Sequence, residues 1–381
     1  MKKLFYAGAV LLALFEILNV YFIMPMPGSQ RMNSINWAYF LYTNRWIFRI
    51  VFTIVMLAGV RAAFSTARRW VPGVVLAALL AVVYMFNFVM TADHMFIQPA
   101  TVAFDKAGET ALNDSTVVIA VAHNSDIRAY PIRYIQYHHQ VQDTVGGRRV
   151  IVTYCNVCRT GRVYEPLVKG QPERFRLVGM DHFNAMFEDE TTRSWWRQVN
   201  GEAVTGPLRG EVLPEAESFQ LTLGKLFQMY PQAQVMRADA TFKEKYDTLG
   251  RFEKGRSKGQ LTRTDSLSWQ DKSWVVGVVK GDASKAFDWN ELKRRRVLHD
   301  FLAGTPVAVV LSEDQQTFAA FERSSAEEAW ELHADTVVVG DQRYNLRGES
   351  YAAGPSLTRL KSYQEFWHSW KTFHPDTEAA K

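Results

Sequence analysis

The stretch 118–155, VIAVAHNSDIRAYPIRYIQYHHQVQDTVGGRRVIVTYC, aligns without gaps to the stretch 275–312, VVGVVKGDASKAFDWNELKRRRVLHDFLAGTPVAVVLS. Asp143 pairs with Asp300 and Gly147 with Gly304, at a constant offset of 157 residues. Each stretch reads as a β-branched strand, a short helical segment, an Asp-x-x-x-Gly turn and a second strand. A match in this order favours an internal duplication over chance similarity.

The duplication predicts an α+β fold in which two β-rich lobes follow an N-terminal anchor. We expect the first lobe at 115–235 and the second at 273–377. Residues 236–272 are polar and charged, and they predict a long connection between the lobes. Residues 93–114 form a linker between the anchor and the first lobe.

The anchor, residues 1–92, reads as three transmembrane helices. An apolar run crosses a hydrocarbon core of about 30 Å when it reaches about 20 residues. Three runs come near this length: Leu4–Met24, Trp46–Phe64 and Val71–Met90. Their polar exceptions include Glu16, Asn87 and, near the two ends of the second run, Arg49 and Arg61, which we expect to extend to the lipid headgroups. A cleavable signal peptide is the alternative for the first run, but no small-residue cleavage site is evident and two runs follow.

Positive charges predict the orientation of this anchor. Basic residues precede the first run, lie between the second and third, and also occur between the first and second: Lys2 and Lys3; Arg61, Arg68 and Arg69; Arg31 and Arg45. The positive-inside rule places the N-terminus in the cytoplasm. Three crossings then predict a multi-pass protein of the inner (cytoplasmic) membrane, with the lipid bilayer as partner and the soluble part periplasmic or extracellular. If the second run does not cross, the soluble part lies inside.

The charge pattern of the soluble part predicts no nucleic-acid binding. The formal net charge of the whole chain is only +5, and basic and acidic residues are mixed along it. There is no basic stripe with interleaved aromatic residues. The sequence also contains no glycine-rich phosphate loop, serine-nucleophile elbow or His-Glu-x-x-His helix.

The two cysteines of the chain, Cys155 and Cys158, lie in VIVTYCNVCRTGRVYEP. Two thiols at this spacing can close a small disulfide, hold a soft metal, or alternate between thiol and disulfide. The second copy has Ser312 and Gln315 at the aligned positions. This difference predicts a site in the first lobe and a structural or substrate-shaping role for the second.

The cysteine pair follows a strand, not the helix N-terminus that activates the thiol of thioredoxin-like proteins. We therefore expect a strand-end loop that is partly open to an attacking thiolate. Arg159 is expected to favour a thiolate at Cys158 by Coulomb attraction.

The run QDTVGGRRVIVTYCNVCRTGRVYEP and the later run FNAMFEDETTRSWWRQVNGEAVTGPLRG resemble the bacterial family called domain of unknown function 3179, over most of residues 115–377. Asn156-Val157 and Arg159 depart from the family pattern. The resemblance implies that selenocysteine replaces a cysteine in some relatives, which favours redox chemistry. The positions that match the motif are Asp143, Gly146, Gly147, Tyr154, Cys155, Cys158, Thr160, Asn184, Asp189, Trp195, Gln198, Gly206 and Pro207.

A metal site would need further ligands, and no cofactor is evident. Met180 and His182 are the candidates to join Cys155 and Cys158 around a soft ion such as Cu(I). Asp181 is placed to orient or charge His182. The pair His138-His139 is expected on a short, solvated polar helix.

Supporting pocket residues are predicted from the neighbourhood of the motif. Trp195 and Trp196 have two interpretations: one ring packs in the core, or the pair forms a lip that holds substrate near the thiols. Asn184, Asp189 and Gln198 either line a pocket or cap turns. The predicted set is Tyr154, Arg159, Thr160, His182, Asn184, Asp189, Trp195 and Gln198.

Two functions from different classes remain open. The first is a membrane-tethered thiol–disulfide oxidoreductase or redox sensor with an envelope redox partner. The second is a non-catalytic envelope binding module, for a metal or a protein, in which the cysteines form a structural disulfide or bind the soft metal.

Overall fold

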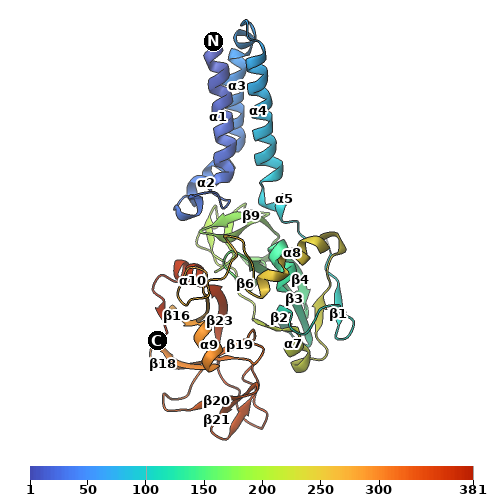
Figure 1. The fold of residues 1–381 in the computed structure, drawn as a ribbon, viewed down its shortest axis with the longest axis vertical. Coiled ribbons are helices and arrows are strands. Elements are labelled where there is room, and N and C mark those ends of the chain that lie inside the picture. Colours follow the sequence, from blue (N-terminus) through green and yellow to red (C-terminus); the bar gives the residue numbers. More distant parts are fainter. Residues whose placement is uncertain (100, 381) are drawn as a thin grey trace. The chain divides into compact units, whose positions relative to one another are not determined.

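The computed structural model describes residues 1–99 and 101–380. The fold is mixed α+β: an N-terminal helical region with three long apolar helices is followed by several β-sheets (Figure 1). The chain forms two compact units. One contains Met1–Ile97 and Leu167–Leu213, and the other contains Gln98–Pro166 and Pro214–Lys381.

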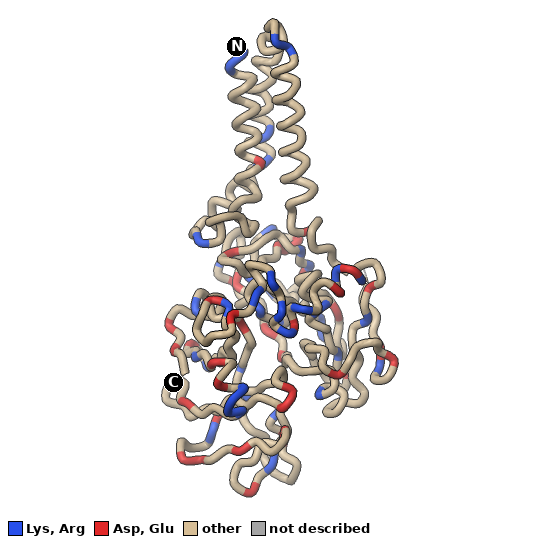
Figure 2. The backbone as a smooth tube through the Cα atoms, in the orientation of Figure 1, with Lys and Arg blue, Asp and Glu red and all other residues tan. Residues whose placement is uncertain are grey.

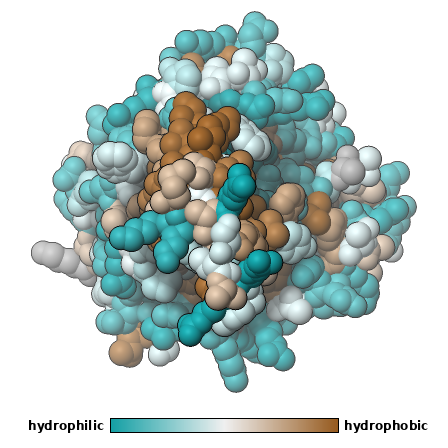
Figure 3. Space-filling view, turned by 90° about the horizontal axis from the view of Figure 1, so that it is seen from above, coloured by the Kyte–Doolittle hydropathy of each residue, from teal (hydrophilic) through white to brown (hydrophobic). Residues whose placement is uncertain are grey.

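The helical region of the first unit has three helices long and apolar enough to cross a membrane. Hydrophobic side chains gather at the helical end of the molecule (Figure 3). Gly8 and Gly59 allow α1 and α3 to pack closely, because a Cβ atom at either position would overlap the backbone of the other helix. The helices are α1 (Lys2–Tyr21), α2 (Ile35–Thr43), α3 (Arg45–Phe64), α4 (Trp70–Tyr84) with its π-helical continuation η2 (Met85–Val89), and α5 (Ala92–Met95).

Arg49 does not extend to the headgroups as expected. Its Nε and Nη2 donate to the carboxylate of Glu16 at 2.7 and 2.8 Å, and Nη2 also donates to Asn87 Oδ1 at 2.5 Å. Asn87 Nδ2 donates to Glu16 Oε2 at 2.9 Å. The Glu16 carboxylate is nearly buried, and a buried charge needs a charged partner. Arg49 of the neighbouring helix supplies that partner, so its side chain does not extend to the headgroups. Elsewhere the helices carry charge mainly at their ends (Figure 2).

The remainder of the first unit is a chain segment inserted between two strands of the second unit. It forms a four-stranded antiparallel sheet in the order β12-β11-β10-β9, plus a small hairpin. The strands are β7 (Leu167–Val168), β8 (Gln171–Pro172), β9 (Phe175–Asp181), β10 (Asn184–Asp189), β11 (Trp195–Arg197) and β12 (Ala203–Thr205).

The second unit contains two sets of elements that follow the same order. The first set is β2 (Val117–His123), β3 (Asp126–Pro131), α6 (Ile132–His138), β4 (Gln140–Val145), β5 (Arg148–Cys155), β6 (Thr160–Tyr164), β13 (Ser218–Thr222), α7 (Leu223–Met229) and β14 (Gln234–Met236). The second is β15 (Trp274–Lys280), β16 (Ala283–Asp288), α9 (Trp289–Arg295), β17 (Val297–Leu302), β18 (Thr305–Leu311), β19 (Phe318–Glu322), β23 (Arg359–Phe366), α10 (Trp367–Phe373) and β24 (Glu378–Ala379).

Strand pairing in the two sets keeps the 157-residue offset of the sequence alignment. Ala120 pairs with Ala129 as Gly277 pairs with Ala286. Left-handed backbone also recurs at this offset: His139 and Arg296 have φ values of 60° and 64°. The closing strands β13 and β23 pair antiparallel with β2 and β15, and the final strands β14 and β24 pair parallel with β3 and β16.

The segments expected as linker and connection carry regular structure. Strand β1 (Phe104–Lys106) pairs with β14 and completes the sheet β1-β14-β3-β2-β13. Helix α8 (Lys243–Glu253), preceded by η3 (Ala240–Phe242), packs on α6 through rings such as Tyr246 against Tyr134. A three-stranded sheet, β20 (Trp330–His333), β21 (Thr336–Val339) and β22 (Gln342–Tyr344), lies between β19 and β23 in the chain.

Candidate functional site

The Cys-x-x-Cys segment is a tight turn between two antiparallel strands of the second unit. Cys155 ends β5 and pairs with Thr160, the first residue of β6. Arg159 reverses the chain with a φ of 57°, in the left-handed region. The turn therefore holds both cysteines within one short loop, as the sequence predicted.

Both thiols are fully buried, so the expectation of a partly open pair is wrong. Burial raises the pKa of the Cys158 thiol, and its hydrogen bond and charge interaction with Cys155 raise that pKa further. A hydrogen bond from Ser369 acts in the opposite direction. Both cysteines are free thiols in this structure, and residues of the second half of the unit cover them.

Lys272 is the cation that interacts with the thiols. Its ammonium donates to the Val157 carbonyl at 2.7 Å and lies 3.0 Å from His368 Nε2. Burial lowers the pKa of Lys272 to about 8, and the nearby Cys158 and Cys155 partly oppose this shift. Burial and the Lys272 charge together lower the pKa of His368 to about 4. The loop between the cysteines is thus held by one cation and one neutral imidazole.

The buried carboxylate of Glu365 is connected to Cys158 through Ser369. Glu365, at the end of β23, accepts from Arg162 Nη2 at 2.5 Å, Thr160 Oγ1 at 3.0 Å and Ser369 Oγ at 2.9 Å. Ser369 also bonds Cys158, and the backbone N–H of Phe366 donates to the Cys158 carbonyl at 2.8 Å. A hydrogen-bonded path through Ser369 therefore connects the Cys158 thiol with the Glu365 carboxyl group.

Arg159 does not serve the thiols as expected. Its guanidinium donates to Gln364 Oε1 and to the carbonyls of Phe252 and Glu253, at 3.0 to 3.1 Å. It also stacks on Trp274, 3.4 Å from the ring centroid. Planar donors and a flat face suit these partners better than a sulfur atom. Arg159 binds the connecting segment, and the side-chain cation that interacts with the cysteines is Lys272.

Tyr154 places a buried hydroxyl close to the pair. Its Oη has no hydrogen-bond partner among residues 1–99 and 101–380. Burial raises the pKa of Tyr154, the Arg159 charge lowers it, and both cysteines raise it slightly further. A buried donor without a partner is costly, so this hydroxyl is available to any acceptor that forms at the site.

The histidine pair 138–139 is not solvated as expected, because both side chains are buried. His138 Nε2 lies 2.6 Å from Tyr246 Oη, and His139 Nδ1 lies 3.1 Å from the Tyr154 carbonyl. Burial lowers the pKa of His139 to about 4. His139 is thus a neutral imidazole that supports the backbone of Tyr154, the residue before Cys155.

The other predicted polar residues belong to the first compact unit, where they organise turns. Asn184 Nδ2 donates to Gln198 Oε1 at 2.9 Å. Asp189 accepts from the backbone of Thr192 and Ser194 and from Trp196 Nε1. These contacts match the turn-capping alternative.

Trp195 and Trp196 are both buried, so neither ring forms an exposed lip. Trp195 lies against Tyr39 and Tyr42 of α2, with centroid distances of 5.1 and 5.3 Å. Its Nε1 donates to Glu188 Oε2 at 3.0 Å.

The metal candidates are divided between the units, since Met180 and His182 lie in the first and the cysteines in the second. His182 Nδ1 lies 2.7 Å from Asp181 Oδ1, and this hydrogen bond raises the pKa of His182. No group of three or more His, Cys, Asp or Glu side chains within the described ranges is arranged to hold a metal ion.

Sequence reasoning missed the residues that enclose the thiols from the second half: Lys272, Glu365, His368 and Ser369. Their sequence context gives one usable signal. Glu365 is a lone carboxylate in the aromatic run YQEFWHSW, and a charge in such a run must be paired if it is buried. Lys272 precedes β15 in a polar segment and carries no comparable signal.

Comparison with known proteins gives one match. No curated protein and no solved structure matches the chain. The family model described as "Protein of unknown function (DUF3179)" matches residues 97–377, which is most of the chain and includes all residues around Cys155 and Cys158. The chain therefore belongs to the DUF3179 family.

Proposed function

We propose that this protein is a membrane-tethered, outward-facing thiol–disulfide redox protein, with Cys155 and Cys158 as its redox centre. In the oxidative step the two thiols lose two protons and two electrons and form one S–S bond. A disulfide compound of the envelope, or the disulfide of a redox partner, accepts the electrons and becomes two thiols.

The acid–base surroundings of the thiols carry this proposal. A merely structural pair needs apolar packing, whereas this pair is enclosed by the Lys272 ammonium, the Ser369–Glu365 hydrogen-bond path and the Tyr154 hydroxyl. The ammonium and hydroxyl stabilise a thiolate as it forms, and the path through Ser369 offers a route for its proton. Full burial limits access, so exchange is expected with small compounds or after local opening of the loop.

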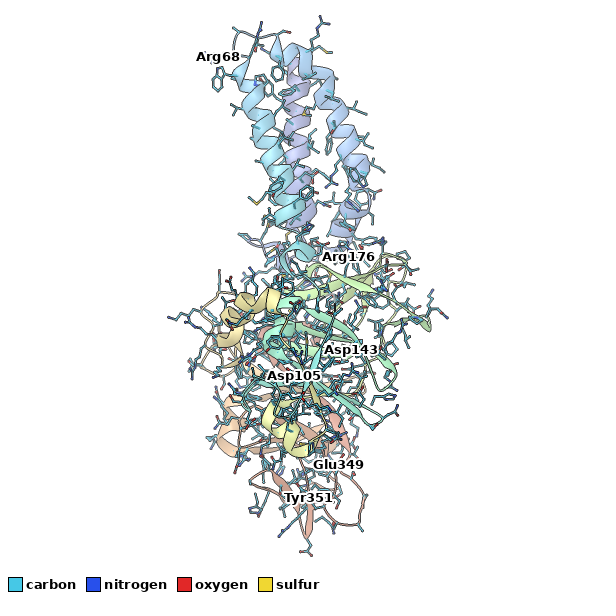
Figure 4. All side chains as sticks on the ribbon, turned by 90° about the vertical axis from the view of Figure 1, so that its right-hand side faces the viewer. Arg68, Asp105, Asp143, Arg176, Glu349 and Tyr351 are labelled. Carbon is cyan, nitrogen blue, oxygen red and sulfur yellow. The ribbon has the colours of Figure 1, made fainter. Side chains whose placement is uncertain are left out.

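Membrane tethering and orientation are part of the proposal. The three apolar helices have the length and composition to span a bilayer. Arg68 lies at the opposite end of the helices from Arg176 of β9 (Figure 4). The positive-inside rule then favours an outward-facing β9 end.

We also propose that the two halves of the second unit arose by internal duplication and close on each other. Thr222, the N-cap of α7, donates twice to a loop of the second half: its N–H donates to Thr317 Oγ1 and its hydroxyl to Asp314 Oδ2. Reciprocally, Phe366 before α10 donates to Cys158 of the first half. In this arrangement the second half completes the thiol site.

A binding module with the cysteines as a staple is the second candidate, and full burial of both sulfur atoms favours it. Buried cysteines in proteins are commonly inert. The two candidates differ in the reduction potential of the pair, because a structural disulfide lies below about −300 mV and an exchanging one lies higher.

The test is to equilibrate the full chain with dithiol–disulfide buffers and to count thiols after alkylation, beside Cys155→Ala and Cys158→Ala. We expect a two-electron transition above about −300 mV. Each variant should lose it while its thermal unfolding changes little, because a ring with two intervening residues removes little chain entropy. Variants that fail to fold, together with a wild-type bond that resists mild reductants, would support the staple.

A further inference from the structure

A cavity of about 180 Å³ lies within the first unit, where the ends of the apolar helices meet α5 and β9. Its walls come from the C-terminal end of α1, the start of α3, the π-helical turn η2 and Arg176 of β9, which is labelled in Figure 4. A water molecule occupies about 30 Å³ of liquid, so the cavity has room for the polar head of an amphiphile.

The arginines around this cavity differ in whether a carboxylate pairs with them. Arg49 is neutralised by Glu16, and Arg176 pairs with Glu188 at 2.8 Å and with Asp93 at 3.1 Å. Arg45 bonds the Tyr42 carbonyl at 2.6 Å and stacks on the Tyr42 ring, but no carboxylate in the described part of the chain pairs with it. Among the arginines that line the cavity, Arg45 is therefore the one without a carboxylate partner in the described part of the chain.

An acceptor in the same wall lacks a donor. Asn19 lines the cavity with 8 % of its surface exposed, and its Oδ1 has no hydrogen-bond partner within the described ranges. A buried amide oxygen left in this state is costly, which favours a ligand that brings a donor. The neighbouring wall is the π-helical turn η2, and such turns are frequent at functional sites.

We infer that this cavity binds the headgroup of a phospholipid that carries a hydrogen-bond donor beyond its phosphate, such as an ethanolamine or glycerol headgroup. The phosphate binds the Arg45 guanidinium, and the ammonium or hydroxyl donates to Asn19 Oδ1 or Asp93. The acyl chains follow the apolar surface of the helices. The inference rests on the membrane-spanning part of the proposed function and is independent of the cysteines.

The experiment is native mass spectrometry of the detergent-solubilised full chain with phosphatidylethanolamine, phosphatidylglycerol and phosphatidylcholine of identical acyl chains. We expect the first two to bind about tenfold more tightly than phosphatidylcholine, whose headgroup has no donor. Arg45→Gln should weaken binding of all three lipids, and Asn19→Leu should abolish only the preference. Arg31→Gln, an exposed arginine between α1 and α2 that does not line the cavity, serves as the matched control.

Equal binding of the three lipids, or an equal effect of Arg31→Gln and Arg45→Gln, would overturn the inference. Competition by soluble glycerophosphoethanolamine identifies recognition of the free headgroup, and its failure beside intact lipid binding assigns the source to the bilayer. Alkaline carbonate extraction of membranes tests insertion separately. A protein that stays in the membrane without lipid preference contradicts this inference alone, whereas a protein that is extracted contradicts the membrane tether.

Discussion

Cys155 and Cys158 acquire their chemical setting from side chains far away in the chain. Lys272 holds the carbonyl between them, and Ser369 joins Cys158 to Glu365. At the aligned positions of the second half the arrangement is different: Ser312 bonds Asp335, whose carboxylate also pairs with Lys225. The turn that holds the thiol pair in the first half thus holds, in the second half, a serine that donates to a paired carboxylate.

His368 predicts a pH dependence of stability. Its pKa is lowered to about 4 in the folded protein, whereas an unfolded histidine titrates near 6.5. Between these pH values the unfolded chain binds more protons than the folded protein. The contribution of His368 to the free energy of unfolding is therefore fully present above about pH 6.5 and decreases toward pH 4, by up to about 3 kcal/mol.

Thermal unfolding of wild type and His368→Gln between pH 4 and 7.5 checks this prediction. The difference between the two proteins should change across the acidic range, while exposed His333→Gln should follow wild type at every pH. Parallel curves for wild type and His368→Gln would show that the imidazole does not contribute.

At the scale of elements, close contacts decide which helix lies on which strand. Gly277 in β15 lies under the ring of Trp370 in α10, and a Cβ atom there would overlap that ring. The aligned position in the first half is Ala120, and Leu223 and Leu226 of α7 pack in the same core cluster. The bulkier tryptophan therefore accounts for the glycine in the second half.

Gly277→Ala should destabilise the protein by about 3 kcal/mol, because an added methyl group in a packed core displaces its neighbours. Gly250→Ala in α8 is the matched control, since open space surrounds that position and alanine favours a helix. Chemical unfolding followed by tryptophan fluorescence measures both. A Gly277→Ala protein as stable as wild type would mean that Trp370 packs elsewhere.

At the scale of the whole molecule, the charged turns of the anchor predict its orientation. A reporter that works only outside the cytoplasm should be active when fused at the C-terminus and inactive when inserted after Arg69. A reporter that works only in the cytoplasm should give the opposite pattern. Cytoplasmic activity at the C-terminus would reverse the orientation and show that one apolar run does not cross.

The sequence by itself determined the family, the α+β class, the three apolar helices and the position of the thiol turn. These features follow from local composition and from an ungapped repeat, and both can be read from the sequence without knowing which distant segments are in contact. The 157-residue offset recurs in the structure, in the register of β2 with β3 and of β15 with β16.

Only the tertiary structure decided which partners meet. It joined Glu16, Arg49 and Asn87 from three helices, buried both thiols and His139, and placed Lys272 instead of Arg159 beside the cysteines. Burial and pairing depend on contacts between segments that are far apart in the chain. A single sequence shows which residues carry charge, but the folded chain determines which of these charges form ion pairs.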